Sequence, residues 1–418
     1  MVPGGLEVPK VLIVADDLTG ANDSAVQFAA RGFKAATLLT DGDGFVGGLL
    51  SDLDDVEVLA ISTESRNVSA ATAVGRIERL VPLVLAGFKP DVTFKKIDST
   101  LRGNAGAEVE AVADILARRK RAGEKVAVVV APAYPSNGRT VRGGYLLVDG
   151  KPLSETYAAH DVLAPVQSSY VPDYFGSLAA RDYLSLRVAD ASDQSDLVSL
   201  VASYPSPARG SILWVGSAGL ANALALSLSP SPDALSLPPG ASDEQAVAPD
   251  PREGGGRTLV LFGSLNPAAI AQVEALSDMD GCRVILPEST TGLPKALAGA
   301  VEAPEKAVVI ASHRLKHCAN NSSTADRSHL VKAFFGEVAE RAVQGRAFDN
   351  LVISGGDVAF AVLGKLGASA ISIRQEILPG VAFGSVIGGQ AAGMGIVTKA
   401  GGFGDAGALK RILTFLDR

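Results

Sequence analysis

A dense group of charged and hydroxyl side chains fills the stretch 95–104, which reads Lys-Lys-Ile-Asp-Ser-Thr-Leu-Arg-Gly-Asn. A short segment with strand character, 91–94, precedes it, and a helical pattern over 105–122 follows it. In open α/β sheets, ligands bind where strands hand over to helices. The cationic groups suit an anionic small molecule, and a helix N-terminus adds N–H donors and partial positive charge. The candidate contacts in this stretch are Lys95, Lys96, Asp98, Ser99 and Arg102.

Two other predicted strands also end in polar side chains. The apolar run 11–15 leads into Asp16 and Asp17, and a helical pattern follows over 21–31. The run 56–61 leads into a loop that contains Arg66, before a helix over 69–86. Asp17 could serve only as a helix cap, and a lone Arg66 could be a solvated surface side chain. Three successive strand–loop–helix units nevertheless carry such groups to one edge, which favours a binding site.

Three glycine-bearing loops occur in the second half of the chain. They are Gly263-Ser264, Gly355-Gly356-Asp357 and Gly401-Gly402-Phe403-Gly404. Glycine lets the backbone approach a phosphate, and a helix N-terminus donates N–H groups to it. Each loop alone is weak, but three together favour nucleotide binding. The sequence contains neither a Walker motif nor a dinucleotide-binding fingerprint after its first strand.

The elements that position these groups predict two α/β domains with mainly parallel sheets. The 418 residues exceed one ordinary core, and the 47% hydrophobic content can fill two. A segment rich in Ser, Pro and Gly separates two series of strand and helix patterns. We expect an N-terminal domain over 1–227, a linker over 228–257 and a C-terminal domain over 258–418. The active site is expected in the cleft between the domains.

The middle of the first domain carries strong turn signals. After a predicted strand over 126–131, prolines and Gly138 predict an irregular loop over 132–140 that displays Arg139 and Thr140. The stretch 143–153 predicts a β-hairpin with Asp149-Gly150 as its turn.

Composition excludes several other functions. The net charge of −7 argues against nucleic acid or an anionic membrane as the main partner. Two cysteines and the absence of a signal-peptide pattern or a spanning apolar run predict a cytoplasmic protein. Cys282 and Cys318 are isolated, and His313 and His317 have no suitably placed glutamate, so no protein-borne metal site is expected.

An anion-binding domain joined to a phosphate-binding domain suits phosphoryl transfer. That reaction needs alignment, cationic charge, a metal ion and exclusion of water more than it needs covalent chemistry. An aspartate is expected to accept or orient the hydroxyl proton. The sequence leaves three candidates open for this catalytic role: Asp17, Asp98 and Asp357.

The motifs Asp-Asp-Leu-Thr-Gly-Ala at 16–21 and Lys-Lys-Ile-Asp-Ser-Thr-Leu-Arg-Gly at 95–103 closely resemble those of the four-carbon acid sugar kinase family. The similarity continues through 131–135, 138–140, Gly263-Ser264 and 354–357, so it spans nearly the whole chain. Members of this family use ATP to phosphorylate the terminal 4-hydroxyl of threonate, erythronate or 3-oxo-tetronate.

The resemblance implies roles for particular residues. In the N-terminal domain, the sugar-acid contacts would be one of Asp16 and Asp17, together with Arg66, Lys95, Lys96, Ile97 and Asp98. In the C-terminal domain, the ATP contacts would be Ser264, Gly355, Gly356, Asp357, Val358 and Gly402, with Mg²⁺ accompanying the nucleotide.

The chain departs from the family pattern at a few positions. Val358 stands where members often have threonine, which removes a hydroxyl that could touch phosphate or magnesium. Ala400 replaces a common serine, Leu265-Asn266 is atypical, and Val162 stands where proline is frequent.

Two other functional classes remain as alternatives. One is a non-catalytic sensor that binds a sugar acid and a nucleotide, and the other is a ribokinase-like sugar kinase. The second would leave the N-terminal motifs unexplained. The sequence permits a homodimer but does not determine the oligomeric state.

Overall fold

The computed structural model describes residues 8–40, 44, 53, 55–121, 123–161, 164–204, 211–229, 256–264, 267–288, 298–299, 301–315 and 324–418. The chain forms two compact units, Met1–Gly240 and Ala241–Arg418. Both are α/β in class with mainly parallel strands, as the sequence predicts. Most of the predicted linker lies outside the described residues, as do Val162, Leu265-Asn266, His317 and Cys318.

The N-terminal unit contains a parallel sheet of short, mostly buried strands: β1 (Val11–Ala15), β2 (Ala35–Leu38), β3 (Val58–Ser62), β4 (Val92–Lys96), β5 (Val126–Ala131), β9 (Leu184–Val188) and β10 (Ile212–Gly216). They lie in the order β2-β3-β1-β4-β10-β5-β9. From β1 the chain passes to the edge strand β2 and returns to β3 beside β1, and it then crosses to β4 on the other side of β1. This reversal makes the junction of β1 and β4 a topological switch point, where α/β sheets bind ligands.

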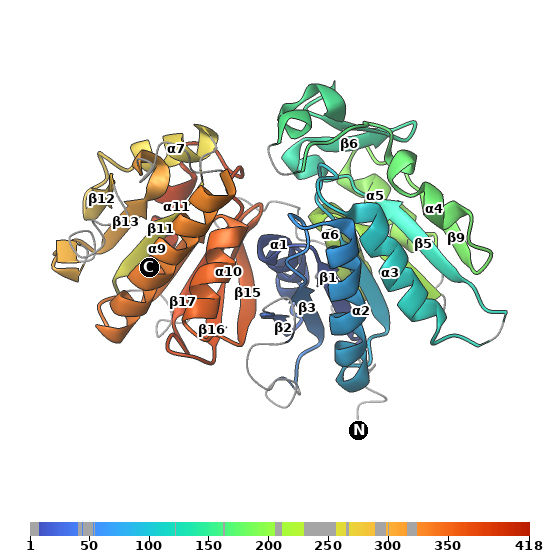
Figure 1. Cartoon of the computed structure of the whole chain (residues 1–418), viewed down its shortest axis with the longest axis horizontal. Helices are drawn as coiled ribbons and strands as arrows, with labels where there is room; N and C mark the ends of the chain where they lie inside the picture. Colours follow the sequence, from blue (N-terminus) through green and yellow to red (C-terminus); the bar gives the residue numbers. More distant parts are fainter. Residues whose placement is uncertain are drawn as a thin grey trace. The chain divides into compact units, whose positions relative to one another are not determined.

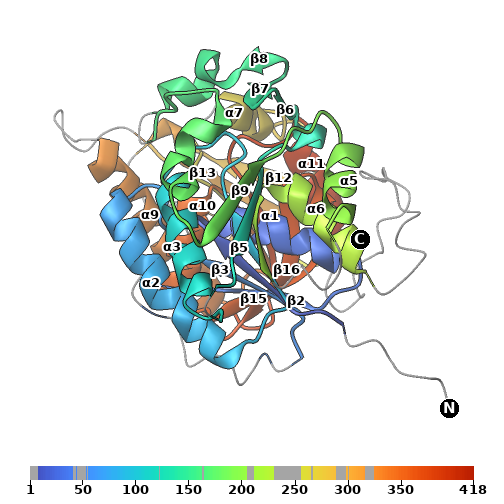
Figure 2. The same cartoon turned by 90° about the vertical axis from the view of Figure 1, so that its right-hand side faces the viewer.

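Helices cover both faces of this sheet. The helices α1 (Leu18–Ala29), α5 (Gln194–Ala202) and α6 (Ala218–Leu228) pack together on one face. The helices α2 (Ala70–Gly87), α3 (Ala105–Ala117) and the short α4 (Gly176–Ala179) cover the other, as Figure 2 shows for α2 and α3. The helix α1 begins earlier than predicted because the Asp17 side chain caps it by accepting from the Gly20 amide.

A small antiparallel sheet follows β5. It consists of β6 (Arg139–Arg142), β7 (Tyr145–Val148) and β8 (Lys151–Pro152), flanked by the 3-10 turns η2 (Pro135–Asn137), η3 (Leu153–Glu155), η4 (Tyr157–His160) and η5 (Val171–Tyr174). The predicted hairpin with its Asp149-Gly150 turn is confirmed. The irregular loop was predicted too long, because Gly138 adopts a φ of +72° and turns the chain so that Arg139 and Thr140 pair with β7.

The C-terminal unit repeats the strand order with which the first unit begins. Its strands are β11 (Thr258–Phe262), β12 (Cys282–Ile285), β13 (Ala307–Ala311), β14 (Asn350–Ser354), β15 (Ala370–Leu378), β16 (Val381–Ile387) and β17 (Gly395–Lys399). They lie in the order β12-β13-β11-β14-β17-β16-β15, in which β16 is antiparallel to both neighbours. The arrangement β12-β13-β11-β14 matches β2-β3-β1-β4, so this unit has its own switch point between β11 and β14.

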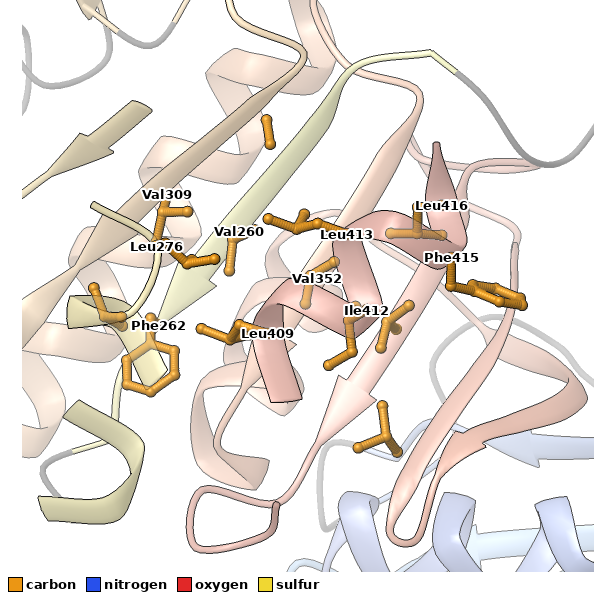
Figure 3. Packing of buried hydrophobic residues seen from close by; sticks show 14 of the residues in the cluster. Val260, Phe262, Leu276, Val309, Val352, Leu409, Ile412, Leu413, Phe415 and Leu416 are labelled. Carbon is orange, nitrogen blue, oxygen red and sulfur yellow. The ribbon is translucent and has the colours of Figure 1, made fainter. Parts of the chain in front are cut away.

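The helices of this unit also form two layers. The helices α9 (Thr324–Gln344) and α10 (Gly356–Lys365) pack side by side (Figure 1), while α7 (Pro267–Glu274) contacts α11 (Ala408–Leu416). In α11, Leu409, Ile412, Leu413 and Leu416 recur at helical spacing and form one apolar face. Figure 3 shows these side chains packed with Val260 and Phe262 of β11 and Val352 of β14. This core holds the carboxyl ends of β11 and β14 in place.

The antiparallel pair β15–β16 was not predicted from the sequence. Register shifts between Ile373 and Gln375, and again between Glu376 and Leu378, interrupt the alternation of β15. The Pro379-Gly380 turn between the two strands, with Gly380 at φ +74°, was the available signal.

None of the described helices combines the length and apolar character that crossing a membrane requires.

Candidate functional site

The switch point of the N-terminal unit gathers the charged residues that the sequence singled out. The strand β1 pairs with β4 on one side, where Ala15 lies opposite Lys96, and with β3 on the other, where Ala15 lies opposite Ser62. Asp16 and Asp17 follow β1, and Arg66 follows β3. The predicted residues therefore meet at the carboxyl ends of three adjacent strands.

Arg66 joins the two aspartates after β1. Its Nε and Nη2 donate to the two oxygens of Asp16 at 2.7 and 2.9 Å, and its Nη1 donates to Asp17 Oδ2 at 2.7 Å. Burial alone would raise the pKa of Asp16, but the charge and hydrogen bonds of Arg66, together with the charges of Lys95 and Lys96, hold that pKa below its usual range. Arg66 is therefore no solvated surface residue. Three of its five N–H groups donate to these aspartates, and the other two have no hydrogen-bond partner among the described residues.

Asp98 and Arg102 form a second bidentate pair. Arg102 Nε and Nη2 donate to the two Asp98 oxygens at 2.7 and 3.0 Å, and Arg102 Nη1 donates to Asp161 at 3.2 Å. Burial would raise the pKa of Asp98, but Arg102 and Arg66 hold it well below its usual range. The pair closes the 95–104 stretch onto itself and ties it to the segment after η4.

The two lysines of this stretch point in different directions. Lys95 Nζ is fully buried and lies 2.8 Å from Glu108 Oε2 on α3. The two groups form an ion pair, although their geometry does not meet the criteria for a hydrogen bond. Lys96 Nζ donates to the Ile97 carbonyl at 2.8 Å and lies toward α1, where a Cβ added at Gly20 would come within 3.0 Å of it. Successive residues of a strand face opposite sides of the sheet, which explains the split. Lys96 is thus the lysine on the side of Asp17.

Ser99 and Gly103 complete the loop. Ser99 is buried directly after Asp98. Gly103 has a φ of +88°, which strains any other residue, and a Cβ there would make a tight contact of 3.1 Å with Arg66 Cγ. The glycine of this motif therefore lets the loop pack against Arg66.

Asp23, one turn after Gly20 on α1, also lies beside this charged group, although the sequence pattern did not single it out. It is buried, and its Oδ1 has no hydrogen-bond partner among the described residues. Burial raises the pKa of Asp23 to about 7, against the opposing effects of the Lys96 charge and a hydrogen bond from Tyr134. The available signal was its i, i+3 spacing from Gly20, which places both on one helix face.

The glycine loops of the C-terminal unit lie at its own switch point. Gly263 and Ser264 follow β11, Gly355 to Asp357 follow β14, and the loop with Gly402 follows β17. Neighbouring strands are linked at these ends, because Gly263 N donates to Ser354 O at 3.2 Å and Gly355 N donates to Lys399 O at 2.9 Å. Three predicted nucleotide loops thus emerge from adjacent strands.

Close packing holds these loops together. A Cβ on Gly263 would come within 2.4 Å of Val358 Cγ2, and a Cβ on Gly401 within 2.6 Å of Ser264 Oγ. Gly355 adopts a φ of +109°, and α10 begins immediately after it. The buried Val358 therefore packs against the β11–α7 loop, whereas Asp357 and Gly402 are exposed. The helix N-terminus and the bare glycines suit an approaching phosphate.

Two buried side chains hold the loop after β17 and were also missed. Lys399 Nζ donates to the carbonyls of Ala400 and Gly401 at 3.0 and 3.1 Å, and Gln272 Nε2 donates to those of Phe403 and Gly404 at 3.0 and 2.9 Å. Burial lowers the pKa of Lys399 to about 8. The strand-end position of Lys399, like that of Lys96 in β4, was the signal.

No group of three or more His, Cys, Asp or Glu side chains suited to a metal ion occurs in the described part of the chain.

Comparisons with known proteins match the two halves of the chain to two different kinds of ligand-binding domain. Residues 11–187 match a model of a sugar-binding N-terminal domain, and residues 259–409 match a model of a nucleotide-binding C-terminal domain. A D-threonate kinase of Bordetella bronchiseptica is 36% identical, with 96% of each chain covered. A D-erythronate kinase of Heliobacterium modesticaldum is 30% identical, with 97% of each covered.

Solved structures share the fold. A Salmonella typhimurium protein superimposes with a TM-score of 0.72 at 22% identity, covering 96% of this chain and 98% of that one. A Haemophilus influenzae protein does so with a TM-score of 0.66 at 21% identity, covering 97% and 100%. With both domain models matched in order and nearly full-length relatives at 36% and 30% identity, the chain belongs to the four-carbon acid sugar kinase family.

Proposed function

We propose that this chain transfers the γ-phosphoryl group of ATP to the terminal 4-hydroxyl of a four-carbon sugar acid, with D-threonate as the first substrate to test. The observation that carries the proposal is the junction of β1 and β4, where Arg66 and Lys96 stand beside the aspartates after β1. Cations there suit the carboxylate of a sugar acid, and aspartates suit its hydroxyls. Relatives named D-threonate kinase favour that acid over D-erythronate and 3-oxo-tetronate.

The sugar acid is proposed to bind through the N-terminal unit. Two N–H groups of Arg66 have no partner among the described residues, and these groups and the ammonium of Lys96 would bind its carboxylate. Asp16 or Asp17, Ile97, Asp98 and Ser99 would surround its hydroxyls. Lys95 and Arg102 are proposed not to contact the substrate directly, because they are already paired with Glu108 and Asp98, respectively.

ATP is proposed to bind through the C-terminal unit. Ser264, Gly355, Gly356, Val358 and Gly402 would meet its phosphates with a hydroxyl and backbone N–H groups. The apolar packing of Val358 on the Gly263 loop gives valine a role here without a hydroxyl.

Mg²⁺ fits the donors of this unit only as a companion of the nucleotide. The exposed Asp357 in the first turn of α10 offers one carboxylate, and Mg²⁺ commonly takes one or two carboxylates with the phosphates. When bound there, Mg²⁺ would neutralise charge on the phosphate oxygens.

The predicted base candidates differ in geometry. Asp98 has both oxygens bonded to Arg102, and Asp17 has both bonded to Gly20, Thr19 and Arg66. Asp17 and Asp98 are therefore proposed to orient the substrate, and Asp357 to serve the nucleotide. The domain boundaries at 227 and 258, a cytoplasmic location, a homodimer and closure of the domains around both substrates also stay predictions.

A substrate screen tests this proposal. Purified protein with ATP and Mg²⁺ would be offered D-threonate, D-erythronate, 3-oxo-tetronate and neutral sugars of similar size, with ADP release as the readout. Turnover confined to the acids supports the proposal. Turnover of neutral sugars alone would support a ribokinase-like enzyme, and binding of acid and ATP without ADP release would support a sensor.

A further inference from the structure

The acids at the β1–β4 junction differ in whether they have an oxygen free to receive a proton. Arg66 occupies both oxygens of Asp16, and Arg102 occupies both oxygens of Asp98. The Gly20 amide, the Thr19 hydroxyl and Arg66 occupy those of Asp17. Asp23 keeps Oδ1 without a partner among the described residues, although it is only 7% exposed.

The surroundings of Asp23 belong to the candidate site. Gly20, one turn earlier on the same face of α1, has the ammonium of Lys96 beside it, and Lys96 and Asp17 are the charges that act on Asp23. Tyr134, which follows β5, donates a hydrogen bond to Asp23. The other strands and the helix that pack on α1, namely β1, β2, β3 and α6, carry no ionisable side chain. The carboxylate thus faces one cation, one acid and one phenol, and those four elements add no further ionisable side chain.

A buried oxygen without a partner is costly, and a ligand that supplies a donor would remove the cost. We infer that Asp23 is the proton acceptor of the reaction, taking the proton of the substrate's terminal hydroxyl through Oδ1. As that hydroxyl oxygen bonds to the γ-phosphorus, the bond from phosphorus to the bridging oxygen breaks, and ADP leaves with its electron pair. The proton stays on Asp23 and passes to water after product release.

The inference rests on the proposed function, and it also fits the acid–base chemistry of Asp23. Burial raises the pKa of Asp23 to about 7, and a general base works best when its pKa lies near the operating pH. Asp16 and Asp98, whose pKa values are held low by arginines, are weaker proton acceptors.

The test compares wild-type protein, D23N and the control D114N across a pH series. Asp114 lies on α3, where Tyr183 hydrogen-bonds it, so D114N is a matched Asp→Asn change away from the junction. We expect D23N to lose about 10²–10⁴-fold in kcat. KM for both substrates should stay close to wild type, and calorimetric binding of the acid should confirm the fold. Wild type and D114N should lose activity as pH falls below about 7, and D23N should lose that dependence.

Three results for D23N would overturn the inference. They are a wild-type kcat, a reduced kcat that still falls below about pH 7 as in wild type, or a change in KM alone. A D23E variant that restores part of kcat together with the acid limb would support it. If wild type turns over none of the acids with ATP, the proposed function itself fails, and that result is visible before any variant is compared.

Discussion

Replacing Arg66 with alanine perturbs the charge balance of the junction most directly. The change removes three hydrogen bonds to Asp16 and Asp17 and the cation that lies 3.9 Å from Asp98. The Arg66 side chain is only 16% exposed, so water cannot replace it easily. Three carboxylates would be left together with one fewer cation among them.

Two magnitudes follow from this geometry. Loss of a desolvated charge partner costs about 2–5 kcal/mol in binding, so KM for the sugar acid should rise by roughly 30-fold to several thousand-fold. Breaking a buried ion pair by removing one partner costs about 3–5 kcal/mol of stability. The stability loss should depend on pH. In wild type, Asp16 has a lowered pKa and stabilises the fold above its unfolded pKa of 3.8. In R66A that carboxylate is buried without its partner, so the deficit should grow as pH rises from about 4 to neutrality.

The assay combines steady-state ADP release over a range of acid concentrations with urea unfolding at two pH values. R66K keeps the charge but not the bidentate fork and should fall between wild type and R66A. Arg118 is an exposed arginine at the end of α3, so the R118A variant controls for the loss of a positive charge. An R66A variant with unchanged KM for the acid would refute the role given to Arg66, whatever its stability.

Three further predictions follow from other contacts. D23N should stabilise the fold, because burial raises the pKa of the Asp23 carboxyl from its ordinary 3.8 to about 7. Urea unfolding should show that the free energy of unfolding rises by at most about 4 kcal/mol above pH 7, and that the rise vanishes below about pH 4. A D23N variant that is less stable than wild type would contradict this prediction. G263A should raise KM for ATP with little effect on acid binding, because the added Cβ would lie 2.4 Å from Val358 Cγ2. The matched control is G364A, whose added Cβ would meet no neighbouring atom. If titration calorimetry gives G263A the ATP affinity of wild type, this steric effect is excluded. K399M should raise KM for ATP by about 10-fold by freeing two loop carbonyls. Wild type should become more stable between about pH 8 and pH 10.5, because Lys399 loses its buried charge in the folded state at a lower pH than in the unfolded state. K399M should lack this rise in stability. If the rise persists in K399M, another group causes it.

The positions of the candidate site residues could be predicted because each follows a short apolar strand. Asp16 after β1, Arg66 after β3 and Gly355 after β14 needed only local pattern and the rule that ligands bind at strand ends. The order of the strands was beyond local pattern. That β1 lies between β3 and β4, and β11 between β13 and β14, depends on long-range pairing.

Side-chain direction explains most of what the sequence left open. Lys95 and Lys96 look equivalent in the sequence, yet adjacent strand residues face opposite layers, so one meets Glu108 on α3 and the other lies beside α1. Asp23 looks like an ordinary acid in a helix until packing buries it. The strand β15 was missed because its register shifts disturb the alternation that reveals a strand.

The most direct test of the central claim is the product of one reaction. Wild-type protein, ATP, Mg²⁺ and D-threonate would be incubated together, and the product analysed by ³¹P and ¹³C NMR. A phosphate ester on the terminal carbon, formed in step with ADP and absent when the acid is replaced by a neutral four-carbon sugar, is the predicted result. No phosphorylated product from D-threonate, D-erythronate or 3-oxo-tetronate, or an ester at another hydroxyl, would contradict the account.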